Sequence, residues 1–163
     1  MDVRTEQSKA AILGAFRQLV FTVGYDAIKV NELIATAGVA RSTFYKHFAD
    51  KRAVLITSME HLLVVLSRCA SGSATCSDIR ALVEHLWENQ QLGRAVFSSN
   101  AFEPIVRALA ELVHEETKQS KIECFAFAYR QLGTIKAWLS GEFHAQQADL
   151  VEQLMHCDRN AAT

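Results

Sequence analysis

The sequence predicts an all-α protein, because its composition is apolar, its periodicity is helical, and strand signals are missing. Half of the 163 residues are apolar, which is enough for a sizeable core, and proline occurs once. Apolar residues recur at i, i+3, i+4 and i+7 along most of the chain, which is the spacing of one helix face. We expect an N-terminal three-helix domain over residues 1–52 and a larger helical domain over residues 53–163.

The first predicted helix covers residues 5–23. Gly24 ends it, and the pair Tyr25-Asp26 begins a turn. Its wide apolar stripe consists of Ile12, Ala15, Phe16, Leu19, Val20 and Val23.

Residues 30–51 carry the most informative pattern of the chain. One short helix is predicted by the apolar positions Val30, Leu33, Ile34 and Ala37. Gly38 can adopt the left-handed conformation that stops a helix. A second short helix follows over residues 40–48, with Phe44 and Phe48 on its inner face. Two short helices joined by a tight glycine turn form a helix-turn-helix unit, whose second helix enters the major groove of DNA.

A long connecting helix is predicted next, with Asp50 as its N-cap and its end near Arg68. The low-complexity loop 71–75 follows it, and Ser77 has the residue type of an N-cap for another helix. A shorter segment over residues 93–100 then carries Val96 and Phe97.

Three further helices are predicted in the last third of the chain. Pro104 suits the first turn of one helix. The run Ser120-Lys121-Ile122-Glu123 has the form of a capping box, which opens a helix that ends before Gly141. That helix is apolar on more than one face, so it requires cover on more than one side. The last helix spans residues 147–156.

The charge is divided unevenly between the two predicted domains. The first 52 residues hold eight Lys/Arg and five Asp/Glu, a net charge of +3, whereas the remainder holds nine and thirteen, a net charge of −4. A basic domain on an acidic body is typical of a protein that contacts a polyanion with one end.

Several other classes find little support in the sequence. We find no secretory signal, no span of about 20 uncharged apolar residues, and none of the G-x-S-x-G, P-loop or H-E-x-x-H motifs. We therefore expect a cytoplasmic, non-enzymatic protein without a cofactor, a metal site or a membrane partner. The cysteines, at 69, 76, 124 and 157, form no C-x-x-C pair and are expected to be reduced thiols.

The segment from Thr5 to Leu55 resembles the DNA-binding domain of the TetR/AcrR transcriptional regulators. The resemblance depends on the pattern A-G-V-x-x-x-T-x-Y-x-H-F-x-x-K, present here from Ala37 to Lys51. It implies an all-α homodimer that binds a pseudo-palindromic double-stranded operator, most often as a repressor, with half-sites about 34–36 Å apart. It also implies a C-terminal domain that dimerises and binds a small ligand.

The resemblance assigns roles to the polar face of residues 40–51. Tyr45, His47 and Lys51 are expected to contact phosphates, and Lys46 either a base or a phosphate. The readers of base edges are expected at the start of the second helix, where Arg41 can pair bidentately with guanine. The other two predicted readers are Ser42 and Thr43. The family often has a threonine near residues 28–30, and Lys29 is expected to replace its phosphate contact.

The C-terminal domain is expected to supply a homodimer interface and a ligand pocket. We place the interface at about residues 120–157, where Gly133 would permit close approach of a partner helix. The ligand is expected to be small and apolar or amphipathic. The pocket candidates are the aromatic residues Trp87, Phe97, Phe102, Phe125 and Tyr129.

Two alternative functions remain open at this stage. The chain could be a helical interaction protein that keeps the helix-turn-helix but acts through a protein partner. It could also be a redox-sensing regulator, since Cys69 and Cys76 lie on either side of a loop. His156-Cys157 has no partner cluster in the sequence that would complete a metal site.

Overall fold

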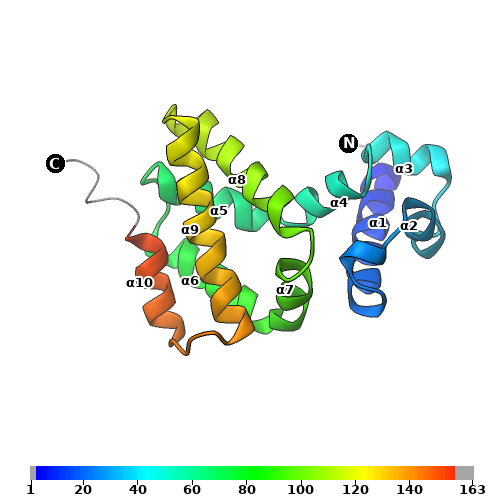
Figure 1. Cartoon of the computed structure of the whole chain (residues 1–163). Helices are drawn as coiled ribbons and strands as arrows, with labels where there is room; N and C mark the ends of the chain where they lie inside the picture. Colours follow the sequence, from blue (N-terminus) through cyan, green and yellow to red (C-terminus); the bar gives the residue numbers. More distant parts are fainter. Residues whose placement is uncertain (1–2, 157–163) are drawn as a thin grey trace.

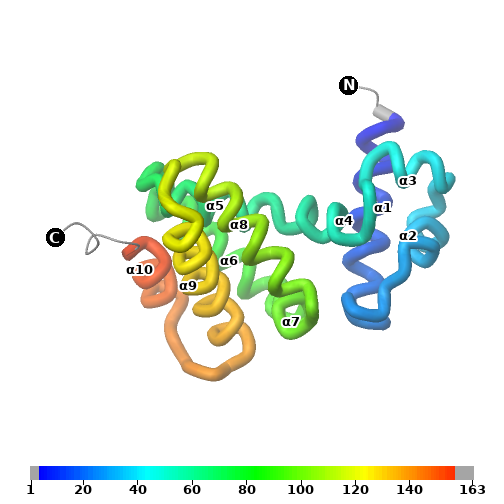
Figure 2. Tube along the Cα trace, turned by 45° about the horizontal axis from the view of Figure 1, so that its top comes forward, coloured from blue at the N-terminus to red at the C-terminus, as the bar shows by residue number. Residues whose placement is uncertain are grey.

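The computed structural model describes residues 3–156, and within them it confirms the all-α prediction, with ten α-helices and one 3-10 turn. The helices form two lobes that α4 joins (Figures 1 and 2). The smaller lobe contains α1 (Val3–Thr22), the 3-10 turn η1 (Tyr25–Ala27), α2 (Val30–Ala37) and α3 (Arg41–His47). The larger lobe contains α5 (Glu60–Ala70), α6 (Cys76–Glu88), α7 (Gln90–Phe97), α8 (Phe102–Thr117), α9 (Lys121–Ser140) and α10 (Gln147–Met155).

The small lobe packs α1 across α2 and α3 around an aromatic core. Phe16, Leu33 and Phe44 are buried there, and the rings of Phe44 and Phe48 lie 6.0 Å apart between centroids. Gly38 has φ 63°, which confirms the predicted left-handed stop between α2 and α3. Val23 was expected in the apolar stripe, but it lies beyond the end of α1 and is 49% exposed.

The predicted connecting helix is wrong in one respect, because the chain bends by 61° between α4 (Lys51–Ser58) and α5. Asp50 is the predicted N-cap of α4, and its Oδ1 accepts a hydrogen bond from the Ala53 amide at 2.8 Å. The bend follows Ile56-Thr57-Ser58, a run of two β-branched residues and a serine that all favour the helix weakly. The Ser58 hydroxyl donates a hydrogen bond to the Leu55 carbonyl, in competition with the backbone hydrogen bonds of the helix.

Helix α4 contacts both lobes, packing on α1 in one and on α8 in the other. The boundary expected after residue 52 therefore falls in its first turn. Among the helices of residues 3–156, none is individually long and apolar enough to cross a membrane, and the bent pair α4–α5 meets that test only when joined.

The start of α6 differs from the expectation. Thr75, not Ser77, is its N-cap, and Thr75 exchanges capping-box hydrogen bonds with Asp78. Asp78 can return the bond because it stands three residues after Thr75, whereas Ser77 lies inside the first turn. These hydrogen bonds lower the pKa of Asp78.

Helix α9 is the central element of the large lobe. Ser120 and Glu123 form the predicted capping box, and Gly141 ends the helix with φ 75°. Its buried face packs on α8 and α7, where the position of a Gly93 β-carbon would lie 2.8 Å from a methyl of Leu139. The Arg94 Nε also donates to the Leu139 carbonyl, which fixes α7 to α9.

Helix α10 closes the large lobe by packing on α6 with Leu150, Val151 and Leu154. The buried amide of Gln131, on α9, donates to the Leu154 carbonyl at 3.2 Å. The indole of Trp138 donates to the Ala145 carbonyl at 3.3 Å, which holds the connection between α9 and α10.

The lobes are also joined away from α4. The Arg17 guanidinium of α1 donates to Asn89 Oδ1 at 2.9 Å, at the junction of α6 and α7. The backbone amide of Asn100 donates to Asp26 Oδ1 at 3.1 Å. The small lobe is thus held against the large one at three places along its length.

Candidate DNA-binding surface and ligand cavity

Helix α3 brings six of the eight predicted DNA-contacting residues together. Phe44 is its only buried residue and anchors the helix in the small lobe. Arg41, Ser42, Tyr45 and Lys46 are exposed, and Thr43 and His47 are half-buried. Because Phe44 faces the core and the other side chains are exposed or half-buried, α3 presents hydroxyl, cationic and aromatic groups on one short helix.

Arg41, at the first position of α3, is held by two neighbours. Its Nη1 donates to Asn31 Oδ1 at 2.9 Å, and its guanidinium lies 5.4 Å from the centre of the Tyr45 ring. Tyr45 in turn packs edge-on against Phe44 at 5.3 Å. Sequence reasoning missed Asn31, since no pattern relates residues ten apart on two different helices.

Lys51 has a structural role that the sequence did not indicate. Its ammonium donates to the Tyr25 carbonyl at 2.9 Å and lies 4.4 Å from the centre of the Tyr25 ring. Burial, followed by the charges of Asp50 and Asp26, raises the pKa of the Tyr25 phenol. Lys51 therefore stabilises the turn after α1 and places its charge at the start of α4, where the helix dipole is positive.

Lys29 lies apart from α3, at the N-cap of α2. Its side chain is exposed, and its backbone amide donates to Glu32 Oε2 at 2.9 Å. Lys29 therefore lies at the start of α2, where the Glu32 carboxylate already accepts from its backbone amide.

We expect Lys51→Ala to lower the stability of the small lobe by about 1–2 kcal/mol, because it removes a charged hydrogen bond and a cation–π contact. Below the unfolding temperature it should weaken binding to any DNA sequence and reduce the salt slope by about one unit. Lys51→Arg is the control and should retain both properties. Thermal unfolding and DNA titration over a range of salt check this, and an unchanged slope would count against the phosphate contact.

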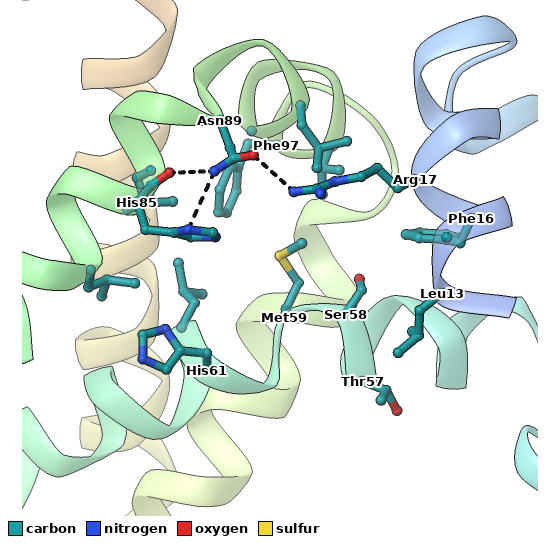
Figure 3. A pocket seen from close by; sticks show the side chains of 17 residues that line it. Leu13, Phe16, Arg17, Thr57, Ser58, Met59, His61, His85, Asn89 and Phe97 are labelled. Carbon is teal, nitrogen blue, oxygen red and sulfur yellow. Dashed lines mark hydrogen bonds between the residues drawn. The ribbon is translucent and has the colours of Figure 1, made fainter. Parts of the chain in front are cut away.

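A cavity of about 360 Å³ lies where the two lobes meet (Figure 3). Its walls come from α1, the α4–α5 bend, α6 and α7. Most of the lining is apolar, including Leu13, Phe16, Met59 and Phe97. A volume of this size is within the range of small-molecule sites.

The polar lining of this cavity comes from four elements. Asn89 connects His85 and Arg17. Its Nδ2 donates to the His85 carbonyl at 2.9 Å, and its Oδ1 accepts from the Arg17 guanidinium. The ring of His61 stands edge-on to that of His85, at 6.5 Å. Figure 3 shows these groups together with Ser58 and Thr57 around the cavity.

Residues 8–57, from α1 into the last turn of α4, match the sequence model of a family described as bacterial regulatory proteins, tetR family. Residues 8–57 of this chain therefore form a TetR-family domain. Its TetR-family domain is also similar to the HTH-type transcriptional regulator EthR of Mycolicibacterium smegmatis, with 36% identity over 58 residues. That match covers 36% of this chain and only 27% of the length of EthR.

The similarity of fold extends beyond the TetR-family domain. A TetR transcriptional regulator from Streptococcus agalactiae has a solved structure that superposes with a TM-score of 0.61 at 22% identity. The superposition covers 93% of both chains. The larger lobe therefore shares its fold with the corresponding part of that structure.

Of the five predicted pocket residues, the cavity includes Phe97 alone. Trp87 is 46% exposed and packs on Trp138, with ring centroids 5.3 Å apart. Phe102 of α8 and Tyr129 of α9 lie together outside the cavity lining, where the Tyr129 hydroxyl donates to Glu103 at 2.7 Å. Phe125 is half-buried outside the cavity.

The residues that sequence reasoning missed are Arg17, His61, His85 and Asn89. They lie far apart in the chain and share no spacing, so only the meeting of the lobes brings them together. Arg17 had one usable signal, since it is a cation on the helix that carries the apolar stripe of the small lobe.

The thiols occupy unlike surroundings. Cys69 is half-buried and Cys76 is exposed, and the two lie on either side of the loop before α6. Cys124 is buried, and burial raises the pKa of its thiol, which makes it less reactive. Within residues 3–156 no group of three metal-ligating side chains is found, and Cys157 of the predicted His156-Cys157 pair lies outside the described residues.

Proposed function

We propose that this chain is a transcriptional regulator that binds a pseudo-palindromic operator as a homodimer and whose DNA affinity is changed by a small ligand, most simply as a repressor. The observation that carries the proposal is the surface of α3, where Asn31 and Tyr45 hold the Arg41 guanidinium on a TetR-family domain. A guanidinium held at the start of a recognition helix suits bidentate pairing with a guanine. Lys29, Lys46, His47 and Lys51 are proposed to bind the flanking phosphates, and Ser42, Thr43 and Arg41 to read the bases.

The direct test is selection of bound sequences from a random double-stranded library by the purified full chain. The proposal requires a recovered site with two inverted half-sites, about one helical turn apart between centres. Recovery of no preferred sequence would instead favour a helical interaction protein that acts through a protein partner. Loss of DNA retention with peroxide and its return with thiol would favour the redox-sensing regulator, with Cys69 and Cys76 as the reactive pair.

Arg41→Ala should change the recovered sequence rather than the affinity for random DNA. The preference for one base pair in each half-site should fall by about 1–3 kcal/mol, because a bidentate contact is removed. Asn31→Ala is the matched control. It removes the hydrogen bond that orients the Arg41 guanidinium but keeps the arginine itself, so its effect on the recovered sequence should be smaller. An identical recovered site for Arg41→Ala and the wild-type chain would contradict the reading role.

Support for the homodimer comes from the outer face of α9. Ile122 is 83% exposed and Tyr129 43% exposed, although both lie on the central helix of the large lobe. Gly133 lies between them and the end of α9, with no atom within 4 Å of a β-carbon position. An apolar, small-residue face of this kind suits close packing of a second copy. We therefore propose an interface on α9, with α10 beside it.

Support for a ligand response comes from the position of the cavity. It is bounded by the TetR-family domain on one side, through α1, and by the large lobe on the other. A molecule bound there contacts both lobes at once, so it favours whichever relative position gives it the better contacts. We propose this cavity as the ligand site in place of the aromatic cluster around Phe102 and Tyr129.

A further inference from the structure

The lining of the cavity between the lobes is unbalanced in charge. Among its 17 residues are one arginine and two histidines, Arg17, His61 and His85, and no aspartate or glutamate. Glu84, on the same helix as His85, lines a separate groove between α6 and α10. The electrostatic environment of the cavity therefore disfavours a cationic ligand and favours an anion.

Arg17 is the strongest candidate for binding an anionic group. Within residues 3–156 it has no ion pair, and its hydrogen bond goes to the neutral amide of Asn89 at 2.9 Å. A guanidinium has five N–H donors in a planar fork that matches a carboxylate. A single bond to an amide oxygen leaves most of these donors available at the cavity (Figure 3).

The rest of the lining limits the other end of the ligand. Leucines and phenylalanines from α1, α5, α6 and α7 form the walls, with Met59 at the α4–α5 bend. Such walls accept a hydrocarbon chain or ring without hydrogen-bonding groups. About 360 Å³ accommodates a molecule of small size, with its polar group at the Arg17 end.

We propose that the ligand of this cavity is a small amphipathic carboxylate, with its carboxylate bound by Arg17 and its hydrocarbon part between α1, α5, α6 and α7. This inference rests on the proposed ligand site and adds the chemical class of the molecule. It also assigns a route of regulation. Arg17 belongs to the DNA-binding lobe and Asn89 to the large lobe, so a carboxylate at Arg17 acts on a hydrogen bond that joins them.

The test uses the purified full chain and three probes of equal chain length, namely octanoate, octanol and octylamine. Isothermal titration and the shift of the unfolding midpoint report binding. Octanoate should bind about tenfold more tightly than octanol, and octylamine should bind more weakly than either. Equal affinity for octanoate and octanol, or preference for the amine, would overturn the proposal.

Two substitutions separate recognition of the anion from the contact between the lobes. Arg17→Gln should reduce octanoate affinity about tenfold and leave octanol affinity nearly unchanged. Asn89→Ala breaks the same hydrogen bond but keeps the guanidinium, so its loss of octanoate affinity should be much smaller than that of Arg17→Gln. If both variants lose octanoate equally, the loss comes from the lobes and the assignment of Arg17 is wrong. Arg17→Lys, which keeps the charge without the fork, should recover part of the affinity.

Arg80→Gln is the matched control, because Arg80 lines the separate groove between α6 and α10. It should bind octanoate as the wild-type chain does, and a loss would place the anion site in that groove and overturn the proposal. The outcome is independent of DNA, since the titrations contain none. Failure of the random-library selection would refute the regulator, whereas failure of the octanoate preference would refute only the ligand class.

Discussion

Replacing Phe44 with alanine should unfold the DNA-binding lobe and abolish DNA binding. Phe44 is fully buried and is the one buried residue within α3, and the buried Phe48 at the end of the helix packs on its ring. Truncating a buried phenylalanine to alanine costs about 3–5 kcal/mol, which is a large part of the total stability of a small domain. Urea unfolding followed by circular dichroism should show an early transition of the small lobe, and retention on DNA should be lost.

Tyr45→Phe is the control for this prediction, because it changes the neighbouring residue without removing its ring. The edge-on contact between Phe44 and Tyr45 should survive, and unfolding should remain as in the wild-type chain. DNA binding should weaken modestly through loss of the hydroxyl contact to a phosphate. A stable Phe44→Ala variant that still binds DNA would show that α3 is held by other contacts.

Gly133→Trp should convert the dimer into a monomer and lower operator affinity by at least about a hundredfold, because one half-site alone then holds each chain. Gly133 has open space at its β-carbon position, so a bulky side chain fits the single chain and obstructs only a partner. The fold should therefore be preserved. Analytical ultracentrifugation and titration of the recovered operator measure the two effects.

Gln91→Trp is the matched control, since Gln91 is exposed on α7, away from the outer face of α9. It adds the same side chain and should leave the dimer and the operator affinity unchanged. A Gly133→Trp variant that sediments as a dimer would place the interface elsewhere and remove the argument from Ile122 and Tyr129.

The sequence predicted those parts of the fold that depend on neighbouring residues. The stop at Gly38, the cap at Asp50 and the capping box at Ser120 are all local, and each lies where the pattern placed it. The bend between α4 and α5 was missed because the apolar spacing continues through it. Only the weak helix preference of Ile56-Thr57-Ser58 indicated a break there.

The candidate site likewise has a part that the sequence predicted and a part that it did not. The polar face of α3 was readable because its residues are consecutive on one short helix. The cavity was not, because Arg17, His61, His85 and Asn89 come from separate helices that meet only in the folded chain. Aromatic residues were a poor guide to it, since Trp87 and Tyr129 pack against other groups near the surface.

The close contact between Gly93 and Leu139 means that the two sides of the cavity are held with different firmness. Helix α7 is held against α9 by that contact and by the hydrogen bond from Arg94 to the Leu139 carbonyl, so the α7 wall of the cavity is fixed to the large lobe. The opposite wall, α1, packs on α7 and is tied to the large lobe by the side-chain hydrogen bonds of Arg17 and of Asp26, without a comparably close backbone contact within residues 3–156. We therefore expect a molecule that enlarges the cavity to displace the DNA-binding lobe, while α9, the helix proposed to pair the two copies, keeps its place.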